Sequence, residues 1–226
     1  MQSKMEVPPC PSLRKRRQQP WPIRLTHWFN VLFVILLAGS GLQILAAYPA
    51  LGPRGALYRW YPFQGIAPPQ ALQLGGWLAG GRHWHFAIAW LFVINGAIYL
   101  AYFWGSGEWH RRLFLIRRDG RTTLWQLAFY LRLSKSPPPP DFYDGPQRLA
   151  YSGVIGLAAV MVLSGLAIYK PVQLHFLTIL FGGYDGARAV HLAGLGLIAL
   201  FAVLHLVLVL SHPRELVKMV TGGQRE

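Results

Sequence analysis

Two histidines of this chain have a spacing that suits chemistry inside a membrane. His191 and His205 are fourteen positions apart in a long apolar stretch. On a straight helix, fourteen residues turn through about 1400°, roughly 40° short of four full turns, and rise about 21 Å. Both imidazoles are therefore expected on one helix face, near opposite ends of a segment long enough to cross a bilayer. Ionisable side chains at that depth are costly, so the pair indicates a functional site.

Two further histidines supply partners from other apolar stretches. His27 opens the first stretch at the end expected to face the cytoplasm, here called the inner end, and matches His205 in depth. His85 opens the second stretch at the outer end and matches His191. Two imidazoles from different helices are what a six-coordinate haem iron takes from its protein, whereas zinc needs three or four converging ligands. The pattern predicts two haems with bis-histidine ligation, which suits electron transfer because no iron position stays open.

Arginines accompany three of these histidines, each three positions earlier and one helical turn closer to water. The pairs are Arg24 with His27, Arg82 with His85, and Arg188 with His191. Arginine is the natural partner of a haem propionate, so the repeated R-x-x-H predicts propionate contacts and selects His85 over the nearby His83. His205 has no such arginine on its own helix, and Arg148, which opens the third apolar stretch at the inner end, is the candidate to supply it.

Two glycines lie close to the histidine faces of their helices. Gly41 comes fourteen residues after His27, and Gly96 comes eleven after His85, so each is expected at the depth of the other haem. A flat porphyrin needs a groove without a protruding side chain, and glycine provides one. The alternative is close packing between membrane helices, in which glycine is also frequent.

The composition is that of a membrane protein. The 226 residues are 53% hydrophobic and 13% charged, and the single cysteine excludes covalent haem attachment through C-x-x-C-H, so the haems are expected to be b-type and non-covalent. We expect an all-α bundle of four transmembrane helices. Their approximate ranges are Ile23 to Ala47, His83 to Trp104, Gln147 to Tyr169, and Ala189 to Ser211. This predicts a transmembrane domain over 21–215, a disordered basic tail over 1–20, and a C-terminal tail over 216–226.

The distribution of basic residues predicts the orientation. Of the 22 Lys and Arg residues, 17 fall at the inner end and five at the outer end. The five are Arg54, Arg59, Arg82, Lys170 and Arg188. By the positive-inside rule both termini are cytoplasmic, which predicts a multi-pass membrane protein. The formal charge of +14 is therefore assigned to membrane topology and not to nucleic-acid binding.

The connecting segments carry weaker signals. At the inner end, Thr122 to Leu133 is expected to form a short interfacial helix, followed by the stiff polyproline spacer SPPPPD at 136–141. At the outer end, the loops over Tyr48 to Gly81 and Lys170 to Gly186 contain many apolar residues. These loops are either packed at the membrane interface or form a docking platform for an external partner.

From about Trp21 to Arg214 the chain resembles the bacterial four-helix dihaem b-type cytochromes. This family includes the cytochrome b subunits of nickel-iron hydrogenases, formate dehydrogenases and thiosulfate reductases. The matching motifs are RLTHW from Arg24, WHFA from Trp84, the SGL turns from Ser40 and Ser164, and VH ending at His191 with a second histidine at His205. Within the group, KPVQ from Lys170 and LFGGYD from Leu180 most resemble the cytochromes that accompany periplasmic molybdenum-cofactor oxidoreductases.

The resemblance implies an electron-transfer subunit of the bacterial inner membrane. The sequence shows no nucleophile, acid–base pair or nucleotide motif, so we do not expect the chain to be the catalytic subunit. The resemblance also implies that His27 and His205 bind the inner haem, that His85 and His191 bind the outer haem, and that electrons pass between membrane quinone and a periplasmic redox subunit at the outer loops. No motif fixes the quinone site, for which the polar candidates are Asn30, Gln43 and Tyr151. The alternatives are a stand-alone superoxide:quinone oxidoreductase, a hydrogenase cytochrome b subunit, and a transporter, which the lack of Asp and Glu in the apolar stretches disfavours.

Overall fold

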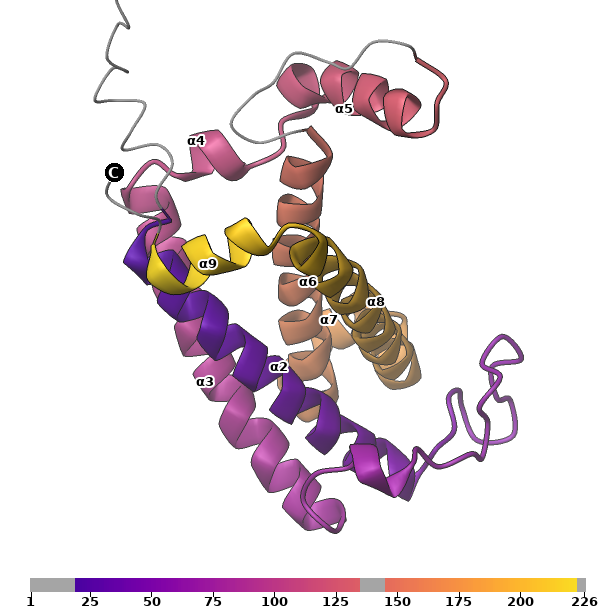
Figure 1. Ribbon diagram of the computed structural model, residues 1–226. Coiled ribbons are helices and arrows are strands. Elements are labelled where there is room, and N and C mark those ends of the chain that lie inside the picture. The colour runs from indigo at the N-terminus through magenta and orange to yellow at the C-terminus, as the bar shows by residue number, and fades with distance from the viewer. Residues whose placement is uncertain (1–18, 135–144, 223–226) are drawn as a thin grey trace, which may run out of the picture.

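The computed structural model describes residues 19–134 and 145–222 and consists of helices and loops (Figure 1). The helices are α2 (Trp21–Ala47), the 3-10 helix η1 (Gln70–Leu72), α3 (Leu78–Gly105), α4 (Trp109–Arg112), α5 (Ile116–Tyr130), α6 (Gly145–Tyr169), α7 (His175–Leu180), α8 (Gly183–Ser211) and α9 (Pro213–Thr221). No strand occurs in those two ranges. The predicted all-α class is confirmed.

Four of these helices, α2, α3, α6 and α8, are long and apolar enough to cross a membrane. Many of their large apolar side chains are exposed, including Ile35 (65%), Ile98 (56%) and Leu208 (63%). Such surfaces are stable only against lipid or a partner, so the four predicted transmembrane helices are confirmed. Helices α3 and α8 begin about five residues earlier than predicted, because their first turns are polar or glycine-rich and lie outside the apolar pattern.

The four long helices form two antiparallel pairs. Helix α2 packs along α3, and α6 packs along α8, with the short helix α7 covering the end of the second pair (Figure 1). A small core of Ala167, Leu177 and Ala187 joins α6, α7 and α8 there. Among the described residues, the backbones of one pair approach those of the other only sparsely. The two pairs therefore meet mainly through side chains, and the histidines lie among those side chains.

Helices α4, α5 and α9 lie at the opposite end from α7, which is the inner end of the bundle (Figure 1). Both ends of the described chain meet there, since the backbone N–H of Gln19 donates to the carbonyl of Gly222 over 3.3 Å. Helix α5 begins six residues before the predicted interfacial helix. The 136–141 spacer and most of the basic tail lie outside the described residues.

Helix α9 was not predicted, because its nine residues straddle the expected end of the transmembrane domain. It begins at Pro213, a residue suited to a first helical turn, and ends at Thr221, directly before Gly222, whose φ of 94° is accessible to glycine at little cost. The indole of Trp28 donates to the carbonyl of Met219 over 3.4 Å. Helix α9 thus crosses the inner end from α8 to the start of α2.

The outer loop that follows α2 is braced by one side chain. The amide of Gln64 accepts from the backbone N–H of Leu51 and donates to the carbonyls of Leu51 and Tyr58, each over 2.9 Å. The loop also presents the exposed aromatic side chains of Trp60 and Phe63. A fixed backbone with outward aromatic residues suits either of the two roles expected for this loop.

Candidate functional site

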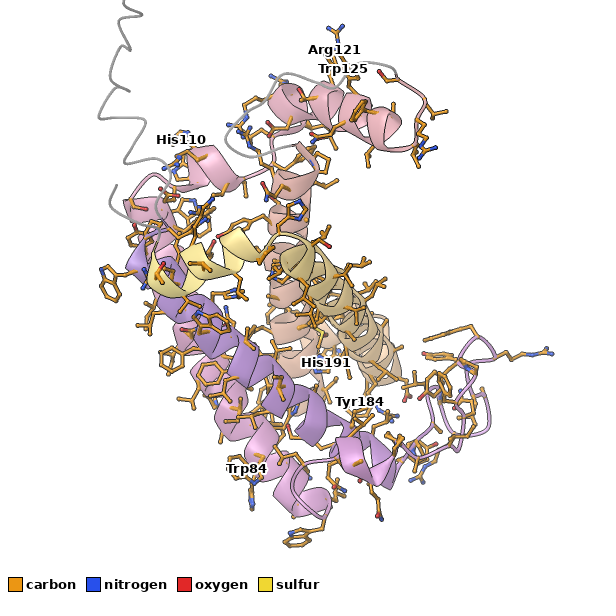
Figure 2. The ribbon with its side chains drawn as sticks, viewed as in Figure 1. Trp84, His110, Arg121, Trp125, Tyr184 and His191 are labelled. Atoms are coloured by element: carbon orange, nitrogen blue, oxygen red, sulfur yellow. The ribbon has the colours of Figure 1, made fainter. Side chains whose placement is uncertain are left out.

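The outer histidine pair lies between the two helix pairs. His85 of α3 and His191 of α8 face each other with their ring centroids 6.2 Å apart and their planes at 69°. In Figure 2 His191 points from α8 toward the α2–α3 pair, whereas Trp84, the neighbour of His85, points away from the bundle. The structure therefore brings together two side chains that are 106 positions apart in the chain.

Each of these imidazoles is held by a fully buried serine on the neighbouring helix. The Ser40 hydroxyl lies 3.0 Å from Nδ1 of His85 and 2.7 Å from the carbonyl oxygen of Leu36. The Ser164 hydroxyl lies 3.0 Å from Nδ1 of His191 and 2.7 Å from a carbonyl oxygen of its own helix, that of Val160. The two arrangements are nearly identical.

These contacts fix the tautomer of both imidazoles. A serine hydroxyl has one proton, and in each case a carbonyl one turn earlier is positioned to receive it. The hydroxyl oxygen must then accept from the N–H at Nδ1 of the imidazole. This leaves Nε2 without a proton, which is the form that binds a metal, and a hydrogen bond at the other ring nitrogen is the usual support of a metal-bound histidine.

Glycines allow the same imidazoles to lie against the helix backbone. A Cβ at Gly41 would lie 3.3 Å from Cε1 of His85, and a Cβ at Gly165 would lie 3.2 Å from Cε1 of His191. Gly41 therefore lies at the depth of the outer pair, as its spacing predicted. No role was predicted for Gly165, Ser40 or Ser164, although the repeated SGL turn was the signal that could have found them.

The inner histidine pair has the same separation but less support. His27 of α2 and His205 of α8 have ring centroids 6.2 Å apart and planes at 67°. The ring of Phe201 stacks on His205, with centroids 5.6 Å apart. In the part of the chain that the structure describes, no protein group forms a hydrogen bond with a ring nitrogen of either histidine. Their tautomers are therefore not fixed by the protein in the way that serine fixes the outer pair.

Both separations fit a metal ion between two imidazoles. Metal–imidazole bonds are about 2 Å long and a ring nitrogen lies about 1 Å from its centroid, so an intervening metal separates the centroids by about 6 Å. The observed 6.2 Å meets this in both pairs. No cluster of three or more His, Cys, Asp or Glu side chains occurs in residues 19–134 and 145–222. Each pair thus offers two ligands, which fits a haem, whose porphyrin supplies the other four.

The arginines near the outer pair differ in their contacts. Arg188 donates to the carbonyl of Ala50 over 2.9 Å and lies 3.4 Å from a carboxylate oxygen of Asp185. It thereby ties the start of α8 to the outer loop. Arg82 is exposed and lies over the ring of Phe86 at 5.8 Å. Both remain predicted propionate partners, and Arg82 has the freer side chain.

The two inner arginines also differ. Nε of Arg24 is buried and has no hydrogen-bond partner among the described residues. The same side chain lines a pocket of about 200 Å³ between α2 and α9. Arg148 instead donates to a carboxylate oxygen of Asp119 on α5 over 2.6 Å. Nε of Arg148 is buried in the same way. The two side chains therefore differ in the carboxylate: Arg148 has Asp119, whereas Arg24 has no acidic partner among the described residues, which fits the predicted propionate contact.

Asn30, one of the quinone candidates, takes part in polar contacts between α2 and α3. The side-chain amide of Asn95 donates to the carbonyl of Thr26 over 3.0 Å and to the side-chain oxygen of Asn30 over 2.8 Å. This buried link fixes the two helices beside His27. At Gly96 a Cβ would have no contact within 4 Å, so the backbone is open there, as a groove requires.

The other two candidates also have protein contacts. The aliphatic part of the Gln43 side chain packs against Gly81 of α3. The hydroxyl of Tyr151 on α6 is hydrogen bonded to the hydroxyl of Tyr99 on α3. Asn30, Gln43 and Tyr151 thus all take part in holding helices together, and a role in quinone binding stays a prediction.

A four-helix membrane bundle with facing histidine pairs at two depths defines the class of membrane cytochromes. The chain belongs to the prokaryotic cytochrome b561 family, whose model matches residues 18–222. This confirms the resemblance to cytochrome b subunits. Members of the family are membrane electron-transfer subunits with b-type haem.

Two relatives support the same assignment. The chain is 37% identical to the "Putative protein-methionine-sulfoxide reductase subunit YedZ1" of Azospira oryzae over 90% of this chain and 94% of the relative. It is 27% identical to the "Probable Ni/Fe-hydrogenase B-type cytochrome subunit" of Cupriavidus necator over 81% of this chain and 74% of the relative. Both relatives are subunits of redox enzymes. No solved structure matches the chain.

Proposed function

We propose that the chain holds two b-type haems, one between His85 and His191 and one between His27 and His205. The observation that carries this proposal is the equal 6.2 Å separation of two histidine pairs at different depths. His191 and His205 are separated by about 21 Å along α8. A bound haem supplies one-electron chemistry at each depth. Ser40 and Ser164 fix the outer ligands, whereas the inner ligands have no such support among the described residues.

The two haems would connect the two faces of the bacterial inner membrane. Both termini of the chain would lie in the cytoplasm. The excess of Lys and Arg at the end that carries α4, α5 and α9 supports this orientation. The chain would then pass electrons between membrane quinone and a redox subunit in the periplasm. The braced outer loop, tied to α8 one turn before His191 by Arg188, is the proposed docking surface.

The proposed partner is a periplasmic molybdenum-cofactor oxidoreductase, as the resemblance carried by KPVQ from Lys170 and LFGGYD from Leu180 implies. The relative in Azospira oryzae is named as a subunit of a protein-methionine-sulfoxide reductase, and it covers nearly the full length of both chains. The second candidate partner is a nickel-iron hydrogenase, which the more distant relative in Cupriavidus necator favours. Co-purification from the native membrane in mild detergent distinguishes them, since a molybdenum protein and a nickel protein differ in metal content.

A haem-to-protein ratio from the pyridine haemochrome spectrum, taken with low-temperature absorption spectra, tests the number of haems. We expect two haems per chain. The variant His205→Leu should retain one, with the spectrum of the outer haem. The matched control is His212→Leu, because His212 is exposed at the same end of α8 and its ring bonds only a carbonyl of its own helix. Loss of both haems or of neither in His205→Leu would contradict the proposed pairing.

A further inference from the structure

The two helix pairs are copies of one arrangement. In the first, Ser40 and Gly41 of α2 hold His85 of α3. In the second, Ser164 and Gly165 of α6 hold His191 of α8. The serines are 124 positions apart, as are the glycines, and the histidines are 106 apart. The contacts agree within 0.1 Å, since both hydroxyl to Nδ1 distances are 3.0 Å and the Cβ to Cε1 distances are 3.3 and 3.2 Å.

The same offsets relate the inner histidines to two tyrosines. The residue 124 positions after His27 of α2 is Tyr151 of α6. The residue 106 positions before His205 of α8 is Tyr99 of α3. His27 and Tyr151 each precede the serine of their helix by thirteen residues. Tyr99 follows His85 by fourteen residues, as His205 follows His191.

The structure also joins these tyrosines, as the equivalence requires. His27 faces His205 between α2 and α8, and Tyr99 is hydrogen bonded to Tyr151 between α3 and α6. The rings of both tyrosines pack against Phe103, with centroid distances of 5.5 Å for Tyr99 and 6.2 Å for Tyr151. The inner end therefore has two equivalent cross-connections, one made of imidazoles and one of phenols.

The inner arginines follow the same relationship. Arg24 precedes His27 by three residues, and Arg148, its equivalent at an offset of 124, precedes Tyr151 by three. Beside the histidine, Arg24 has no acidic partner among the described residues, although Nε is buried in both guanidinium groups. Beside the tyrosine, Arg148 has the carboxylate of Asp119 at 2.6 Å. A protein carboxylate thus takes the place at the tyrosine side that a haem propionate would take at the histidine side.

We propose that Tyr99 and Tyr151 are the counterpart of the inner histidine pair in the second copy, and that these four side chains decide which side of the inner end holds haem. The proposal rests on the proposed function, since it takes His27 and His205 to be haem ligands. Neutral phenols satisfy each other through one hydrogen bond and would need to lose a proton to bind iron. The tyrosines therefore close the α3–α6 side and limit the inner end to one haem.

The test exchanges the two pairs without altering the composition of the chain. The reference variant carries His27→Tyr and His205→Tyr, and it should retain only the outer haem. The exchanged variant adds Tyr99→His and Tyr151→His. We expect it to regain a second haem, doubling the haem-to-protein ratio of the reference variant. The unaltered His85 and His191 serve as the internal control, because the spectrum of the outer haem reports that the bundle has folded.

The outcomes separate this proposal from the proposed function. If the unmodified chain does not hold two haems, or the reference variant does not lose one, the proposed function fails. If both behave as expected and the exchanged variant stays at one haem with a normal outer spectrum, the role of the tyrosines is refuted. If the exchanged variant loses the outer haem too, a third variant decides whether the tyrosine positions can hold haem. This variant carries Tyr99→His and Tyr151→His and keeps His27 and His205. A second inner component in its electron paramagnetic resonance spectrum supports the proposal, and an unchanged spectrum overturns it.

Discussion

The hydroxyl of Ser164 lies 3.0 Å from Nδ1 of His191 and 2.7 Å from the carbonyl of Val160, so the serine connects a proposed ligand to the backbone of a neighbouring helix. The hydrogen bond between Ser164 and His191 can have only one direction. Because the carbonyl receives the hydroxyl proton, the imidazole donates to the serine, and Nε2 is left to bind iron. Ser40 and His85 repeat it, whereas the inner histidines have no such support among the described residues.

Removing this hydroxyl should alter the outer haem alone. In Ser164→Ala, His191 loses its hydrogen-bond acceptor and becomes a weaker electron donor to iron, which destabilises the oxidised form. Loss of one hydrogen bond, on the order of 1 kcal/mol, corresponds to a rise of some tens of millivolts in the midpoint potential. A redox titration resolved by low-temperature spectra measures it. The control is Ser106→Ala, whose hydroxyl bonds only its own helix. An equal change in both haems would argue against the assignment.

The glycine beside His191 should be needed for the outer haem to bind. A Cβ at Gly165 would already lie 3.2 Å from Cε1 of the imidazole, so the branched side chain of Gly165→Val cannot fit without displacing the ring. We expect the haem-to-protein ratio to fall from two to one, with the inner spectrum unchanged. Gly156→Val is the control on the same helix, because a Cβ there has no contact within 4 Å. Retention of both haems by the Gly165 variant would be inconsistent with this geometry.

The sequence was sufficient to predict the four membrane helices and the pairing of the histidines by depth. The reason is physical, because the cost of burying polar groups in lipid makes apolar length and intramembrane histidines unambiguous signals. That His27 faces His205, and His85 faces His191, follows from helix direction alone. Whether these pairs bind haem stays a prediction.

The sequence did not reveal the side chains that hold the ligands or the partner of Arg148. Ser40 and Ser164 look like ordinary small residues of membrane helices, and only their distances to Nδ1 show that they fix a tautomer. Arg148 donates to Asp119, which is 29 residues earlier on a separate short helix, and its contact with a propionate stays a prediction. Helix α9 was missed because a short amphipathic segment after Ser211 resembles a tail.

Arg24 should raise the potential of the inner haem. Its guanidinium, with Nε buried and unpartnered in the described part of the chain, would favour the reduced, less positive form of a nearby haem. Arg24→Gln should lower the inner midpoint potential by tens of millivolts and leave the outer one in place, whereas Arg24→Lys should keep most of the effect. The same redox titration measures all three proteins. An inner potential that is identical in Arg24→Gln and the unmodified chain would exclude Arg24 as a propionate partner.

Asp119 should anchor α5 to the bundle in a pH-dependent way. Burial disfavours its charge, but hydrogen bonds from Arg118 and from the backbone N–H of Leu115, together with Arg148, outweigh burial and lower the pKa of Asp119 to about 2. Because the pKa is lower in the folded state, the carboxylate stabilises the fold fully above its unfolded pKa of about 4 and ceases to do so as the pH falls toward 2. This contribution is on the order of 2 kcal/mol at neutral pH.

The variant Asp119→Asn should therefore weaken the docking of α5 on α6 at pH 7 while both haems remain. Hydrogen exchange measured by mass spectrometry should show faster exchange across α5 in this variant than in the unmodified chain. Arg121→Gln is the control, because Arg121 projects from α5 away from the bundle (Figure 2). In the unmodified chain the protection of α5, corrected for the intrinsic exchange rate, should decline between about pH 4 and pH 2, the interval in which the carboxylate becomes protonated. Protection that is constant across this interval would mean that the ion pair with Arg148 does not hold α5 in place.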